Sequence, residues 1–137
     1  MISQALLIIG ASIFGMLGFV HLIYTFFTDK FNAHNPDVTE AMKSTSPNIT
    51  KETTVWRAWI GFNASHSLGS IFFAAIYIPL AFLHIEFIVN NSWFAVLPSI
   101  VGLSYLLLAK NYWFKLPFFG ILFSTISFIG AFVLINT

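Results

Sequence analysis

The side chains most capable of chemistry gather in residues 56–70, within a long apolar run. If this stretch is helical, successive side chains lie about 100° apart around the axis. Five residues with polar groups then fall within about one quarter of the circumference: Trp59, Asn63, His66, Ser67 and Ser70. Imidazole and amide groups hydrogen-bond, and imidazole also carries protons and ligates metals. This face is therefore the first candidate for a functional site.

A second histidine, His21, lies in an earlier apolar run and shares a helix face with Gly10 and Gly18. Glycine marks the side of a membrane helix that packs against its neighbours, so His21 is expected to point into a helix bundle rather than at lipid. Each histidine lies in the half of its run that adjoins residues 28–54. We predict that His21 and His66 face a common interior at similar depths.

Two kinds of role are open to this cluster. As an interhelical link, Asn, His and Ser side chains hydrogen-bond between helices at about 0.6 kcal/mol each. As a binding site, His21 and His66 would ligate a b-type haem, with Arg57 near its propionates. A quinone or lipid headgroup held by Asn63, His66 and Trp59 is an equal alternative.

Recognised catalytic classes find little support in these residues. Ser65 and Ser67 flank His66, but neighbours on a helix do not face each other, so they form no nucleophile–base pair. No acidic residue lies inside any of the four predicted spans, as a di-iron carboxylate site would require. Two histidines without cysteine are too few for a zinc centre. The sequence thus favours a non-enzymatic protein without a resident metal.

The elements that position these residues follow from composition. The chain has 137 residues, of which 58% are hydrophobic and 8% charged, whereas soluble domains carry about 25% charge. Since a membrane-spanning helix needs about 20 mostly apolar residues, spans are expected at residues 4–27, 55–83, 93–113 and 116–135. The predicted fold is all-α, a four-helix transmembrane bundle in a single domain over residues 1–137.

Opposite the polar face of the second span, Gly61, Ser65 and Gly69 follow small-xxx-small spacing. Such spacing lets a second helix approach closely, so this side is expected to pack tightly, within the bundle or in its assembly. The same apolar run continues to residue 89, too long for one perpendicular helix at about 1.5 Å per residue. We expect a kink at Pro79 followed by an interfacial tail.

The first loop, residues 28–54, is longer than a connection requires. Asn35-Pro36-Asp37 is typical of a helix N-cap with proline at the first helical position. A short amphipathic helix through about Ser44 would turn Val38, Ala41 and Met42 toward the membrane surface. This loop is interpreted as a solvated lid, with a gate over a ligand site or a docking surface for a partner as alternatives.

Orientation follows from the basic residues, which border the first and third loops alone: Lys30, Lys43, Lys51, Arg57, Lys110 and Lys115. By the positive-inside rule both loops are cytoplasmic and both termini lie outside, in the bacterial inner membrane. The expected partners are the lipid bilayer and other membrane subunits, and not nucleic acid.

Three stretches carry a resemblance to a known group of proteins. They are residues 21–31, residues 109–114, and residues 56–69 with the pattern Trp-Arg-x-Trp-x-Gly-Phe-Asn-x-Ser-His-Ser-x-Gly. In these the chain resembles a family of small uncharacterised bacterial four-helix membrane proteins, and that resemblance brings no activity. We interpret the chain as a non-catalytic accessory or assembly subunit of a larger membrane complex. Haem b, quinone or lipid binding through His21 and His66 is the alternative.

Overall fold

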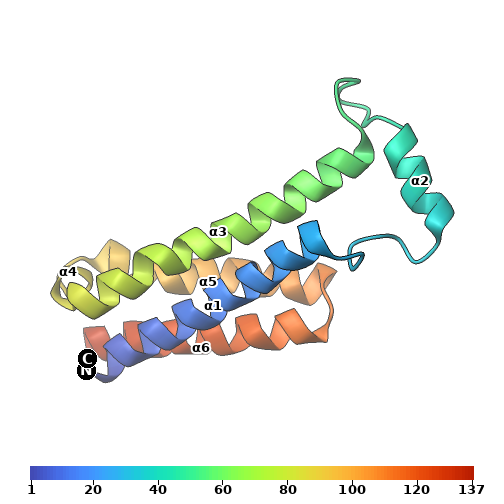
Figure 1. Cartoon of the computed structure of the whole chain (residues 1–137). Helices are drawn as coiled ribbons and strands as arrows, with labels where there is room; N and C mark the ends of the chain where they lie inside the picture. The colour runs from blue at the N-terminus through green and yellow to red at the C-terminus, as the bar shows by residue number, and fades with distance from the viewer. The chain divides into compact units, whose positions relative to one another are not determined.

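The computed structural model describes residues 1–137 and is entirely helical (Figure 1). The six helices are α1 (Ile2–Phe27), α2 (Pro36–Ser44), α3 (Val55–Leu83), α4 (Ile85–Val89), α5 (Ser92–Tyr112) and α6 (Lys115–Asn136). Four of them, α1, α3, α5 and α6, are long and apolar enough to cross a membrane. The predicted all-α fold with four transmembrane helices is confirmed, and each predicted span ends within two residues of the observed helix.

The chain divides into two compact units. The first contains Met1–Leu17 and Ser70–Thr137, and the second contains Gly18–Gly69. Helices α1 and α3 contribute to both units without interruption, and a single domain over residues 1–137 stays a prediction. The two units are described in turn.

One aromatic cluster joins all four long helices of the first unit. The ring of Phe14 in α1 lies 5.5 Å from that of Phe73 in α3, 4.8 Å from that of Tyr105 in α5 and 6.3 Å from that of Phe128 in α6, between ring centroids. Phe14 and Phe128 are both fully buried. Offset and edge-to-face pairs of this kind add to the packing of the core, so Phe14 is the central contact of this four-helix bundle.

Glycines allow α1 to approach its neighbours in this unit. A Cβ atom on Gly10 would lie 2.5 Å from Cε1 of Phe128, and one on Gly15 would lie 2.6 Å from Cβ of Ala74. Distances this short leave no room for a side chain, so α6 and α3 pack directly against the α1 backbone. This confirms that the glycine side of α1 faces the bundle, as small residues do at membrane helix interfaces.

The long apolar run of residues 55–89 is divided at His84. Helix α3 continues through Pro79 to Leu83, and the chain then leaves helical geometry at His84, with φ −137° and ψ 42°. Because His84 is not helical, α3 ends at Leu83, and the rest of the apolar run forms a separate short helix, α4. A kink at Pro79 stays a prediction.

The second unit contains the predicted short helix of the first loop. Oδ1 of Asn35 accepts a hydrogen bond of 3.0 Å from the backbone N–H of Asp37, and Pro36 is the first residue of α2. This side chain satisfies one of the free N–H groups at the helix start. The prediction of a helix over Pro36–Ser44 is confirmed. Val38 and Ala41 are exposed on α2, and their contact with a membrane surface stays a prediction.

Candidate functional site

The predicted polar residues meet where α1 and α3 face each other in the second unit. Nε2 of His21 lies 3.0 Å from Oδ1 of Asn63. Nδ2 of Asn63 donates a 2.9 Å hydrogen bond to the carbonyl of Trp59 one turn earlier in α3. Since the amide nitrogen is the donor there, Oδ1 is left as the acceptor, and His21 donates through Nε2–H. The Asn63 amide is thereby held in one orientation between its own helix and α1.

His66 completes a pair of imidazoles. Its ring centroid lies 5.4 Å from that of His21, with the two planes 62° apart in an edge-to-face arrangement. Both side chains are half-buried, and Asn63 lies almost one turn before His66 on the same helix. The predicted approach of His21 and His66, with Asn63 beside them, is therefore confirmed.

An aromatic residue of the first loop, Phe31, packs against His21 of this pair. Its ring lies 4.6 Å from that of His21 and 6.2 Å from that of Trp59, between centroids. The indole Nε1–H of Trp59 donates a 3.1 Å hydrogen bond to the carbonyl of Phe31, which fastens the loop at this point. Trp59 thus adjoins the cluster through Phe31. Sequence reasoning missed Phe31, because a phenylalanine between two helices belongs to no periodic pattern.

Arg57 is not part of the cluster. Its side chain is exposed, and only its backbone N–H is engaged, donating 3.2 Å to Oγ1 of Thr54. Arg57 and Trp59 are two positions apart, a spacing that puts the two side chains on different sides of a helix. Of the five residues predicted for the site, the structure brings together His21, Asn63, His66 and Trp59.

Two serines of this stretch, Ser65 and Ser67, bond to their own helix. Oγ of Ser67, which is fully buried, donates 3.0 Å to the carbonyl of Asn63, and Oγ of Ser65 donates 3.1 Å to that of Phe62. A hydroxyl bonded in this way has no proton left to donate to a ligand in this conformation. The imidazoles and the amide therefore carry what chemistry the cluster has.

This arrangement suits hydrogen bonding better than metal or haem ligation. No group of three or more His, Cys, Asp or Glu side chains is placed to hold a metal ion. A bis-histidine haem requires both imidazoles to point at an iron between them, whereas Nε2 of His21 is directed at Asn63 and its ring packs against His66 and Phe31. Haem b does not fit between these two rings as they stand.

The opposite side of α3 differs from its prediction. A Cβ on Gly61 would meet nothing within 4 Å, and Gly61, Ser65 and Gly69 are all exposed. The expectation that this face packs within the bundle is therefore wrong at Gly61, and its packing in an assembly stays a prediction. The buried side of α3 carries the polar residues instead, from Asn63 and Ser67 onward. Polar side chains are costly in contact with hydrocarbon, so they take the interior and leave the small residues outside.

Comparisons with protein-family models, with curated proteins and with solved structures find no match for this chain. The resemblance of residues 56–69 to a family of small bacterial membrane proteins accordingly stays a prediction.

Proposed function

We propose that this multi-pass membrane protein is a non-catalytic accessory or assembly subunit of a larger complex in the bacterial inner membrane. The observation that carries the proposal is the exposed small-residue face of α3, defined by Gly61, Ser65 and Gly69. This face fits a transmembrane helix of a partner subunit.

The physical reason lies in how helices associate in lipid. Hydrocarbon solvates a leucine as well as a protein interior does, so association depends on close backbone packing, which small residues permit. A helix that only faces lipid gains nothing from a glycine, and glycine inside a helix is less favourable than alanine by about 0.5–1 kcal/mol. Five glycines of the first unit, Gly10, Gly15, Gly102, Gly120 and Gly130, each have a close neighbour, as Gly10 has Phe128. Gly61 lacks such a neighbour within the chain and would acquire one in a complex.

The histidine cluster supports the same proposal. The His21–Asn63 hydrogen bond links α1 to α3, and the Asn63 amide is bonded on both of its ends. A cluster whose members bond one another stabilises the fold, and a rigid fold presents the Gly61 face in a constant geometry.

Co-purification in a mild detergent tests this proposal. The tagged chain is expected to recover partner subunits in fixed stoichiometry, and Gly61→Leu is expected to reduce that recovery at least tenfold without lowering thermal stability. Ala5→Leu, which places the same leucine at an exposed position of α1, is the matched control and keeps full recovery. Equal recovery by the Gly61→Leu and Ala5→Leu variants would show that the face contacts lipid alone.

A second candidate function is the binding of a quinone headgroup at His21 and His66. It is favoured by the contact of two imidazoles inside a membrane span, since polar residues at such depth commonly mark a binding pathway. The His66→Ala variant separates the two proposals. Loss of a co-purifying quinone with unchanged subunit recovery supports the second, and unchanged quinone content argues against it.

A further inference from the structure

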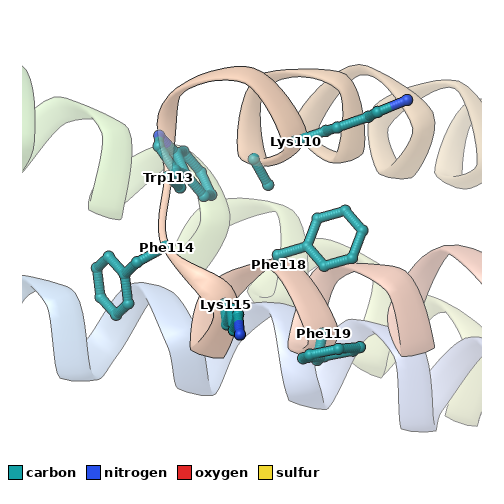
Figure 2. A pocket seen from close by; sticks show the side chains of 7 residues that line it. Lys110, Trp113, Phe114, Lys115, Phe118 and Phe119 are labelled. Carbon is teal, nitrogen blue, oxygen red and sulfur yellow. The ribbon is translucent and has the colours of Figure 1, made fainter.

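The turn between α5 and α6 contains a hollow of about 410 Å³ (Figure 2). It lies at the end of two antiparallel membrane helices that pack side by side (Figure 1). Two lysines and four aromatic side chains line it: Lys110, Trp113, Phe114, Lys115, Phe118 and Phe119. An apolar surface with two cations is a combination that neither the histidine cluster nor the Gly61 face explains.

The two lysines have no acidic partner. Both are exposed, and neither takes part in an ion pair, since the one salt bridge in the protein joins Lys43 to Glu40. Within the first unit the single acidic side chain is Glu86 of α4, which precedes the 21-residue helix α5. At 1.5 Å per residue, α5 separates Glu86 from Lys110 and Lys115 by about 30 Å. Within the first unit, the positive charge of this hollow is therefore not paired with an acidic side chain.

The position of Lys115 adds a second reason for an anion. Lys115 is the first residue of α6, and the preceding Phe114 supplies no side-chain cap. A helix start carries partial positive charge, which disfavours a cation and favours an anion. Lys110, in the last turn of α5, has a favourable dipole position, but Lys115 does not. An anion at Lys115 and the start of α6 would offset this repulsion.

The aromatic residues indicate what else the ligand carries. Phe114 is 70% exposed and Phe119 50% exposed, and neither has a polar atom to offer water. At the end of a membrane span such rings contact acyl chains just below the headgroups. Basic pockets between membrane helices are typical binding places of anionic lipid headgroups. We propose that this hollow binds one anionic phospholipid, with its phosphate at Lys115 and the start of α6, an acyl chain against Phe118 and Phe119, and Lys110 adding positive charge from the end of α5.

Native mass spectrometry of the full chain in a mild detergent tests the proposal. With equimolar phosphatidylglycerol and phosphatidylcholine, we expect a one-to-one complex with phosphatidylglycerol in at least tenfold excess over that with phosphatidylcholine. Each lysine is expected to raise the affinity for an anionic lipid about fivefold. The Lys110→Gln, Lys115→Gln double variant is therefore expected to lose that preference. The Lys110→Arg, Lys115→Arg double variant retains both charges and is expected to keep it.

The matched control is the Lys30→Gln, Lys51→Gln double variant, which removes the same charge from the first loop and is expected to bind phosphatidylglycerol as the unmodified chain does. An equal loss in this control would overturn the site, since the attraction would then come from net charge. Unchanged binding by the Lys110→Gln, Lys115→Gln variant would overturn it as well. Excess inorganic phosphate is expected to leave the lipid bound, and displacement by phosphate would show that the hollow takes the free anion instead.

Discussion

Nε2 of His21 and Oδ1 of Asn63 lie 3.0 Å apart and join two transmembrane helices, α1 and α3. Because Asn63 is also anchored to the Trp59 carbonyl at 2.9 Å, His21 meets an acceptor whose direction is already set. Preorganisation of this kind makes a single interhelical hydrogen bond specific for one register of the two helices. The energetic and assembly consequences can each be measured.

The His21–Asn63 contact is expected to show a coupling energy in a double-mutant cycle. For His21→Ala and Asn63→Ala, stability in detergent should give about 0.6 kcal/mol of coupling, with about 1.7 kcal/mol as the upper end for membrane proteins. Unfolding by SDS, followed by circular dichroism, measures it. A cycle of His21→Ala with Ser65→Ala is the control, because Ser65 bonds to its own helix. Coupling no greater than in that control would contradict the contact.

Two glycine positions are expected to respond in opposite ways to the same change. Gly10→Ala places a methyl group 2.5 Å from the buried ring of Phe128 and should lower stability by about 1–3 kcal/mol through overpacking. Gly61→Ala meets open space and should leave the stability of the isolated chain unchanged or slightly higher, since alanine is the better helix former. Thermal denaturation of both variants decides this. A destabilised Gly61→Ala variant would mean that this side of α3 is covered within the chain.

Phe14 is expected to be the most sensitive aromatic position. Its ring is 1% exposed and contacts aromatic rings from three other helices, so Phe14→Ala should cost about 3–5 kcal/mol through lost contacts and a cavity. Phe72→Ala is the control, because Phe72 is 60% exposed on α3 and should change stability by less than about 1 kcal/mol. Similar losses in the two variants, by SDS titration, would argue against the aromatic cluster as the centre of the core.

Membrane orientation is expected to follow the basic residues. Reporter fusions at residues 40 and 115 should be cytoplasmic, and fusions after Thr137 should be external, because lysine and arginine border the first and third loops alone. Paired alkaline phosphatase and green fluorescent protein fusions provide the measurement, each reporter serving as the control for the other. A cytoplasmic C-terminus would reverse the assignment of all four spans.

The amino-acid sequence by itself determined where the helices begin and end. A hydrocarbon layer requires long apolar stretches with internally bonded backbone, and these are readable as composition, so four spans were predicted to within two residues. The start of α2 at Asn35-Pro36 was equally predictable, because an N-cap acts over only a few residues. The polar side of α3 was also predictable, because few side chains in the chain can hydrogen-bond at such depth. His21 and His66 could therefore be matched before their distance was known, whereas the His21–Asn63 hydrogen bond came from the structure.

Only the tertiary structure decided which apolar surfaces are buried. In lipid, buried and exposed positions are both apolar, so hydropathy does not separate Phe14, at the centre of the first unit, from Phe72 on its outside. For the same reason Gly10 and Gly61 follow similar small-residue patterns, yet one meets Phe128 and the other meets open space. Phe31 covers His21 through a loop with no periodicity, and its position depends on the Trp59 hydrogen bond from another helix. Contacts between segments distant in the chain depend on shape complementarity, which becomes visible only when the helices are packed.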